Sequence, residues 1–311
     1  MASTARGAFL TGLAAFRETL DEPRVLGADA VGAFLRRGLT VASFNLLEAF
    51  ISDRLDELAA HINGGITQFL DLPIKLQRRA IVNTITIGRN QINWGAKDLP
   101  ELRSYSETIG KSLSAVGATL ELSPLTWKWA GSNMAANDFR DALRFLHVND
   151  PWENVRLLAG RLSFLVLDSL GQPIDQSADL SSLASERHAC AHDASKSVTA
   201  IWLRAAPERI LRYAITFDAL ASVSANYFRI GDPNILSDER RISHGSVSIR
   251  FVVERSRNFA ELLEGRTRAT KVSSDVGALF VDAQSRCTPN QLLIQQSKTN
   301  AILNWIIPAV S

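Results

Sequence analysis

Several features that mark common protein classes are missing from this chain of 311 residues. It has only two cysteines, Cys190 and Cys287, which cannot build a disulfide framework and are typical of a protein from a reducing compartment. Arg6 and Arg17 interrupt the apolar N-terminal stretch, so we expect an amphipathic helix there rather than a signal peptide or a membrane span. No internal repeat and no low-complexity tract is present. We therefore expect a cytoplasmic protein that does not associate with a membrane.

A strong charge of one sign is missing as well. The formal net charge is +2, so we do not expect the molecule as a whole to attract nucleic acid. Of the 34 basic residues 27 are arginines, whose forked guanidinium suits phosphate contacts, although the base composition of a genome explains such a bias equally well. Apolar residues make up 46% of the chain, which is enough to build one large domain or two modest ones.

Residues 1 to 230 show the apolar periodicity of helices. The longest predicted helix spans residues 29 to 62, because Phe44, Leu47 and Ile51 recur every three or four residues along one face, and Gly64 follows its end. The other predicted helices span residues 8–20, 73–92, 99–120, 135–146, 152–170, 180–198 and, beginning at Pro207, 207–227. This pattern predicts a mainly α helical bundle with extra helices inserted between its first and second halves.

The character of the chain changes after Gly231-Asp232-Pro233. Residues 246 to 254 alternate polar and apolar side chains, as a half-buried strand does, and residues 277–282 and 291–295 are further strand candidates. We therefore predict a helical domain over residues 1–230 and a small α+β extension over residues 235–311.

The motif with the clearest chemistry is Arg187-His188-Ala189-Cys190-Ala191-His192. A histidine near neutral pH can move the proton of a ribose 2′-hydroxyl, and an arginine can hold the phosphate whose charge builds up as that oxygen attacks. Five residues correspond to about 500° on an ideal helix, so the Cα directions of Arg187 and His192 differ by about 140°. One helix therefore holds this pair imperfectly.

Other interpretations of these residues stay open. An interhelical ion pair and a surface histidine would account for Arg187 and His192 without catalysis. His188 and His192 lie four residues apart, on one helix face, where two imidazoles can share a metal ion. Cys190 points elsewhere and Arg187 would repel a cation, so we predict neither a metal site nor a cofactor, and we expect Cys190 to be a small buried side chain.

Two polar residues of the long predicted helix are candidates for a supporting role. Asn45 and Glu48 lie three residues apart, and we expect them to face the motif helix. A carboxylate there would orient Arg187 or His192 and change its pKa. An ordinary solvated helix face is the alternative.

The pattern of Arg187, the polar His188, three small or apolar residues and His192, late in a helical domain, resembles the signature of the HEPN superfamily. The residue after the arginine is usually Asn, Asp or His there, and His188 fits. The segment Phe44-Asn45-Leu46-Leu47-Glu48-Ala49-Phe50-Ile51 resembles the first core helix of bacterial HEPN nucleases. The resemblance covers roughly residues 25 to 230, and Asp193 departs from it where many members have Gly.

The resemblance implies a metal-independent endoribonuclease that cleaves single-stranded or loop RNA and leaves a 2′,3′-cyclic phosphate. Arg187 and His192 would be catalytic, and His188, Glu48 and Asn45 would support them. It also implies a homodimer in which two motifs line one cleft, and a role as a toxin or in anti-phage defence, with an antitoxin or defence protein as partner. The alternative is a non-catalytic HEPN module that binds a protein partner or a nucleotide.

Overall fold

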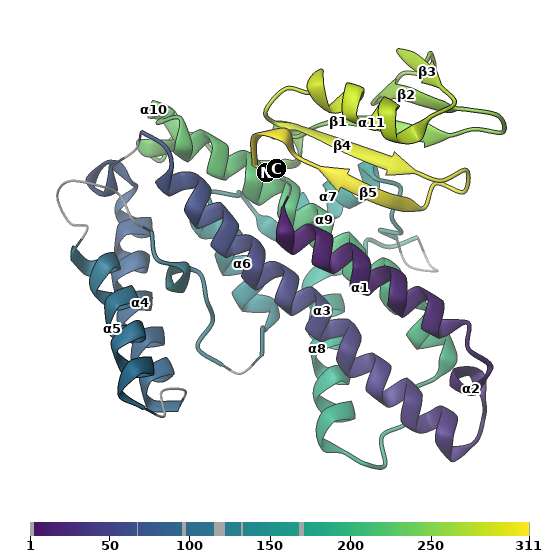
Figure 1. Ribbon diagram of the computed structural model, residues 1–311, viewed down its shortest axis with the longest axis horizontal. Helices are drawn as coiled ribbons and strands as arrows, with labels where there is room; N and C mark the ends of the chain where they lie inside the picture. Colours follow the sequence, from purple (N-terminus) through teal and green to yellow (C-terminus); the bar gives the residue numbers. More distant parts are fainter. Residues whose placement is uncertain are drawn as a thin grey trace.

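Two long helices form the spine of the molecule. The computed structural model describes residues 3–66, 68–94, 98–114, 122–131, 133–167 and 171–310. In it α3 (Ala30–Asn63) packs along α9 (Ala200–Arg229), and α1 (Thr4–Leu20) lies beside α3 (Figure 1). None of the described helices combines the length and the apolar character needed to cross a lipid bilayer.

Local signals in the sequence explain the limits of α3. The Asp29 carboxylate accepts a hydrogen bond from the Gly32 amide (2.7 Å), which caps the first turn. At the other end Gly64 lies at the C-cap, and its amide donates to the Ala60 carbonyl (3.0 Å). The apolar face that the sequence predicts is confirmed, because Phe44, Leu47 and the apolar residues that continue their row are buried.

Helix α9 corrects one prediction. Pro207 does not begin this helix but lies inside it, and the helix begins at Ala200, where the Thr199 hydroxyl accepts a hydrogen bond from the Trp202 amide (3.2 Å). A proline inside a helix removes one backbone hydrogen bond. Every residue from 210 to 225 is buried, so burial of this helix on all sides outweighs that cost.

The remaining helices surround this spine. They are α2 (Pro23–Leu26), α4 (Ile74–Trp94), α5 (Leu99–Ser114), α6 (Ala136–Phe145), α7 (Pro151–Arg161), α8 (Gln176–His192) and α10 (Pro233–Leu236). The pair α4 and α5 packs side by side at one end of the molecule (Figure 1). Short 3-10 turns cover Phe69–Asp71, Pro124–Thr126, His244–Ser246 and Pro308–Val310.

Two of the predicted helices end elsewhere. The helix predicted over residues 152–170 ends at Arg161, because Ser163 takes a left-handed backbone (φ 64°) and the Phe164 amide bonds back to Ala159. The helix predicted over 180–198 spans 176–192, and Asp193 ends it by accepting hydrogen bonds from the amide and hydroxyl of Ser195. The predicted segment 115–120 and residues 168–170 lie outside the described residues.

The C-terminal part forms a mixed sheet. Its strands β1 (Ser248–Glu254), β2 (Phe259–Leu263), β3 (Lys271–Ser273), β4 (Gln291–Gln296) and β5 (Ile302–Ile306) are arranged in the order β3-β2-β1-β4-β5. Strands β1 and β4 are parallel, and the other pairs are antiparallel. The predictions of β1 and β4 are confirmed to within about two residues, and the sequence did not predict β2, β3 and β5.

The strand predicted over residues 277–282 is wrong, because this segment is the helix α11 (Val276–Ser285). The Asp275 carboxylate caps it by accepting from the Ala278 amide (3.1 Å). Its buried residues Leu279, Phe280 and Ala283 have helical spacing. The chain also has to cross between the parallel strands β1 and β4, and such a crossover usually contains a helix.

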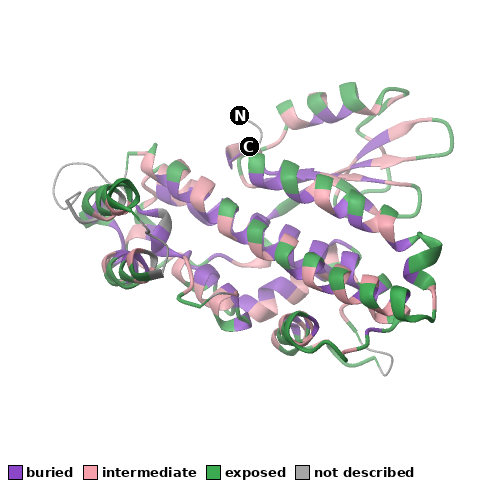
Figure 2. Cartoon of the chain, turned by 60° about the horizontal axis from the view of Figure 1, so that its bottom comes forward, coloured by how far each residue is buried: buried purple, intermediate pink, exposed green. Residues whose placement is uncertain are grey.

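The sheet shares the core of the helical part. One of its faces contributes Ile249, Leu292 and Trp305 to the apolar cluster that contains α3 and α9. The other face, with Val252 and Leu293, packs under α11 in a second, smaller cluster. In Figure 2 the buried residues lie on the sides of the helices that face other elements, and the exposed residues lie on the outer sides. The predicted architecture, mainly α with a small C-terminal α+β extension, is confirmed at this level, and its HEPN-like topology stays a prediction.

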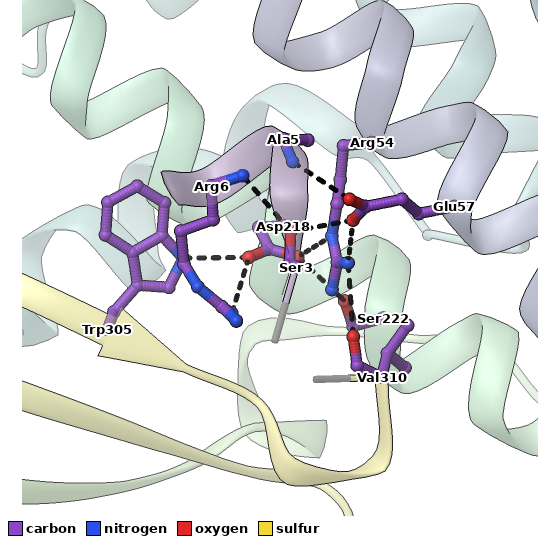
Figure 3. Close-up of polar contacts among 9 residues, drawn as sticks. All are labelled: Ser3, Ala5, Arg6, Arg54, Glu57, Asp218, Ser222, Trp305 and Val310. Atoms are coloured by element: carbon purple, nitrogen blue, oxygen red, sulfur yellow. Dashed lines mark hydrogen bonds and ion pairs between the residues drawn. The ribbon is translucent and has the colours of Figure 1, made fainter. Parts of the chain in front are cut away.

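A buried polar network lies where the sheet meets the helices (Figure 3). The Arg54 guanidinium on α3 donates to Asp218 (2.7 Å) and Ser222 (3.0 Å) on α9, and to the carbonyl of Val310 (3.1 Å). The Trp305 indole on β5 donates to the second oxygen of Asp218 (2.8 Å). The network therefore connects both helices of the spine to the C-terminal segment.

The N-terminal residues join the same network. The Arg6 guanidinium lies 3.8 Å from Asp218, and the Ser3 hydroxyl and the Ala5 amide donate to Glu57. Burial by itself raises the pKa of Asp218, but the charges of Arg54 and Arg6 outweigh it and hold that pKa below its ordinary value. Asp218 is therefore an ionised carboxylate in the interior, and the two ends of the chain lie side by side next to it.

Candidate functional site

The motif lies on the C-terminal half of α8, at the lower centre of Figure 1. Asp175 caps the first turn of α8 by accepting from the amides of Ser177 (2.9 Å) and Ala178 (3.0 Å). Leu180 and Leu183 are buried, and α8 packs on α3 through this side. The packing fixes the rotation of α8 and so decides which motif side chains face α3.

Arg187 is the motif residue that faces α3. It is half-buried, and its Nε donates a hydrogen bond to Oδ1 of Asn45 (3.1 Å). The prediction that Asn45 faces the motif helix is confirmed. Within the described residues Nη1 and Nη2 of Arg187 make no hydrogen bond, so the forked end of the guanidinium remains available for an anion.

Glu48 lies near Arg187 but has another partner. It accepts hydrogen bonds from the Met134 amide and the Trp129 side chain. Burial raises the pKa of Glu48 above its ordinary value, and the Met134 amide and the Arg187 charge reduce that shift. Glu48 therefore anchors the segment around Met134 to α3 and acts on Arg187 through its charge rather than through a hydrogen bond.

His188 and His192 lie together on the outer side of α8. Both are exposed, and their ring centroids are 4.5 Å apart with an interplanar angle of 49°. They form an accessible pair of imidazoles at the C-terminal end of the helix.

A single chain does not assemble the complete motif. Within the described residues no hydrogen bond or ring contact joins Arg187 to His192, as the angular separation of about 140° predicts. Arg187 reaches toward α3, whereas His192 remains on the exposed side. A ligand that contacts both groups has to span the edge of α8, or a second chain has to bring its own motif to the first.

The structure shows no metal centre in the part of the chain that it describes. There, no three side chains of the His, Cys, Asp or Glu types are close enough to share an ion, so the pair of His188 and His192 has no third ligand. Cys190 is only 5% exposed, and its thiol is within hydrogen-bond reach of the Thr40 side chain. The prediction of a small buried side chain is confirmed.

Exposed apolar side chains lie at the same end of the molecule, and the sequence analysis missed them. Val31 and Phe34 on α3 and Ile201 on α9 are 55%, 65% and 84% exposed. The Arg36 and Arg37 side chains of α3 donate to carbonyls of the 193–199 segment, which directly follows His192. The signal was present in the sequence, because Val31 and Phe34 are three residues apart on the face opposite the residues that become buried.

Comparison of the chain with protein-family models finds no match. No curated protein and no solved structure matches it either. Membership of the HEPN superfamily therefore stays a prediction from the motif, and the proposal that follows depends on the motif and its geometry.

Proposed function

We propose that the protein is an endoribonuclease that cleaves single-stranded or loop RNA without a metal ion. The observation that carries this proposal is that Arg187, held by Asn45 with its forked end unbonded, lies on the same short helix end as two exposed imidazoles in contact. This transesterification needs a group that stabilises the charge on the phosphate, which Arg187 supplies, and groups that take up and donate protons, which His192 and its counterpart in a dimer supply. We further propose, from the resemblance of the motif alone, a cytoplasmic toxin or anti-phage role with a protein partner that controls it.

The proposed reaction is an attack within the RNA. His192 removes the proton from a ribose 2′-hydroxyl, and the 2′-oxygen bonds to the adjacent phosphorus. The bond from phosphorus to the 5′-oxygen breaks, and this oxygen takes a proton from the protonated His192 of the partner subunit. The products are a 2′,3′-cyclic phosphate and a 5′-hydroxyl. Arg187 stabilises the charge that accumulates on the phosphoryl oxygens, and His188 orients the phosphate.

We propose a twofold homodimer as the active form. Val31, Phe34 and Ile201 lie at the motif end of the molecule, and a second copy would remove these side chains from water. A twofold axis at this end places the same residues on both sides of the interface, so each His192 approaches its counterpart. The dimer would supply the second motif that one chain lacks.

The second candidate function is a non-catalytic module that binds a protein partner. The observation that favours it is that Arg187 is engaged by Asn45 and does not reach His192 within the chain. In this case the exposed apolar side chains would meet another protein, and the arginine would only join α8 to α3.

Substitution of the motif residues tests the proposal. His192→Ala should leave the fold intact, because the side chain is exposed, and should lower the cleavage of a fluorescent single-stranded RNA in EDTA by about 10² or more. Arg187→Ala should cause a similar loss. Arg187→Lys should rescue the activity only partly, because it keeps the positive charge but not the fork. His188→Ala should cause the mildest loss. Arg204→Ala, an exposed arginine of α9, is the matched control and should cleave like the wild type.

Light scattering on the same proteins tests the dimer. Wild type and His192→Ala should both be dimers at micromolar concentration. A fully active monomer would contradict the shared cleft. Cleavage by His192→Ala at the wild-type rate would contradict the nuclease and favour the binding module.

A further inference from the structure

A second site lies away from the motif, at the junction of α4, α6 and the N-terminus of α7. The cavity there has a volume of about 680 Å³ and shares no residue with the motif cluster. A smaller cavity of about 280 Å³ adjoins it, and both are lined by Lys75 and Phe145. The larger volume lies within the range of about 300–1,000 Å³ typical of small-molecule sites.

Basic side chains predominate around these two cavities. The lining contains the six cations Lys75, Arg78, Arg79, Arg140, Arg144 and Arg241 and the three carboxylates Asp141, Asp150 and Asp238. Asp141 pairs with Arg140 (2.8 Å), and Asp238 pairs with Arg241 (2.6 Å) and, at a longer distance, with Lys75 (3.7 Å). Arg78 and Arg144 are exposed and have no hydrogen bond or ion pair within the described residues. An excess of positive charge therefore remains for an anion.

The backbone at the cavity adds N–H groups, whose partial positive charge also favours an anion. Helix α7 spans 11 residues and begins beside the cavity, and the side chain of its N-cap residue, Asp150, makes no capping hydrogen bond. Pro151 has no amide N–H, so the first-turn amides that remain for an anion belong to Trp152 and to Glu153, whose carboxylate pairs with Arg156. The helix dipole favours negative charge at this end. Two left-handed residues, His147 (φ 58°) and Asp150 (φ 30°), bend the chain tightly into this position.

A buried histidine lies in the wall of the cavity. His147 is 4% exposed and lines the cavity, and its Nε2 lies 3.4 Å from Asp238. Burial lowers the pKa of this imidazole, and the Asp238 charge and a backbone hydrogen bond with Arg240 partly offset that shift.

We propose that this cavity binds a phosphorylated small molecule of about the size of a mononucleotide. Its phosphate lies among Arg144, Lys75 and the N-terminus of α7. A bare phosphate ion would leave most of the volume empty, whereas Phe145 and Trp152 give the cavity an apolar wall for an organic group. The proposal does not depend on ribonuclease activity, because none of these residues belongs to the motif.

Calorimetric titration of the full-length protein tests the site. The probes are inorganic phosphate, ribose 5-phosphate, adenosine 5′-monophosphate and adenosine. We expect at least one of the two phosphorylated organic probes to bind more tightly than inorganic phosphate, and adenosine not to bind. The double variant Lys75→Ser, Arg144→Ser should weaken this binding by about tenfold or more, because each lost contact is a hydrogen bond to a charged group. Both side chains are exposed, so the variant should fold.

Arg204→Ser, which removes an exposed arginine of α9 outside the cavity, is the control and should bind like the wild type. The proposal is overturned if no phosphorylated probe binds at millimolar concentration, or if adenosine binds as tightly as its monophosphate. It is also overturned if the double variant binds like the wild type, or if a single-stranded RNA binds at these residues and none of the small probes does. Loss of RNA cleavage in His192→Ala leaves all of these outcomes unchanged, so the two proposals fail independently.

Discussion

Ion pairs of the same chemistry contribute very differently to this molecule, because their burial differs. In the pair of Arg54 and Asp218 both side chains are 0% exposed, whereas in the pair of Arg17 and Glu208 the exposed fractions are 32% and 55%. When a buried charge loses its partner, no water is present to solvate the charge. When an exposed charge loses its partner, water solvates it. The Arg54 pair also has further hydrogen bonds from Ser222 and Trp305, so it belongs to a network rather than to a single contact.

We predict that Asp218→Asn lowers the free energy of unfolding by about 3–5 kcal/mol, because it removes the buried carboxylate next to Arg6 and Arg54 and leaves Arg54 with Glu57 as its carboxylate partner. Glu208→Gln, the exposed counterpart, should change it by less than about 1 kcal/mol. Urea unfolding followed by circular dichroism measures both values. Equal effects of the two substitutions would show that the network does not hold an ionised pair.

At the scale of elements, substitution of two glycines of α3 tests two effects independently: close backbone packing at Gly32 and helix propensity at Gly38. A Cβ on Gly32 would lie 2.2 Å from the carbonyl oxygen of Gly27, where the end of α2 meets α3, whereas a Cβ on Gly38 would meet no atom within 4 Å. Gly32→Ala should therefore destabilise the protein by about 1–3 kcal/mol, because backbone has to move. Gly38→Ala should stabilise it by up to about 1 kcal/mol. Thermal unfolding checks the pair, and a shift of the same sign in both would contradict this packing.

The elements that the sequence predicts well are those whose signals are local. The face of α3 follows from apolar spacing and its ends from Asp29 and Gly64, all within one segment. Pro207 was predicted wrongly because tertiary packing outweighs the local signal there. The segment 277–282 was predicted wrongly because a short apolar run fits a strand as well as a helix. Residues 210–225 keep α9 helical through their burial, and the parallel pairing of β1 with β4 makes α11 a crossover helix.

The candidate site follows the same rule. The contact of Arg187 with Asn45 was predictable, because each residue lies on a helix with a recognisable apolar face and the two faces pack together. The partner of Glu48 was not, since the Met134 amide belongs to an irregular segment. The cavity was not predictable either, because its basic lining comes from α4, α6 and the loop around Arg241, which are far apart in the sequence.

At the scale of the whole molecule, the C-terminal part completes the interior of the helical part. Removal of residues 235–311 would take away Trp305 from Asp218, the Val310 carbonyl from Arg54 and the apolar face of the sheet from the main cluster. We predict that a protein of residues 1–234 is aggregated or only partly helical in circular dichroism and size-exclusion chromatography. A soluble fragment with cooperative unfolding would instead support the sequence-based prediction of two separate domains.

The dependence of stability on pH should come from histidines in the interior. Burial, together with the charges of Arg229 and Arg54, lowers the pKa of His61 from 6.5 to about 4, and burial lowers the pKa of His147 as well. As the pH falls below about 6.5, the unfolded chain takes up protons that the folded protein does not, so stability falls until about pH 4. At pH 5 the loss from His61 should be about 1–2 kcal/mol relative to pH 7, after allowance for its partial exposure.

His61→Gln removes the titrating group and should reduce the difference in unfolding free energy between pH 7 and pH 5 by that amount, with the contribution of His147 remaining. The exposed His188→Gln is the matched control and should keep the wild-type difference. Urea unfolding at the two pH values measures it. If the difference is unchanged in His61→Gln, then the pKa of His61 is the same in the folded and the unfolded chain. In that case its burial beside Arg229 does not weaken its protonation.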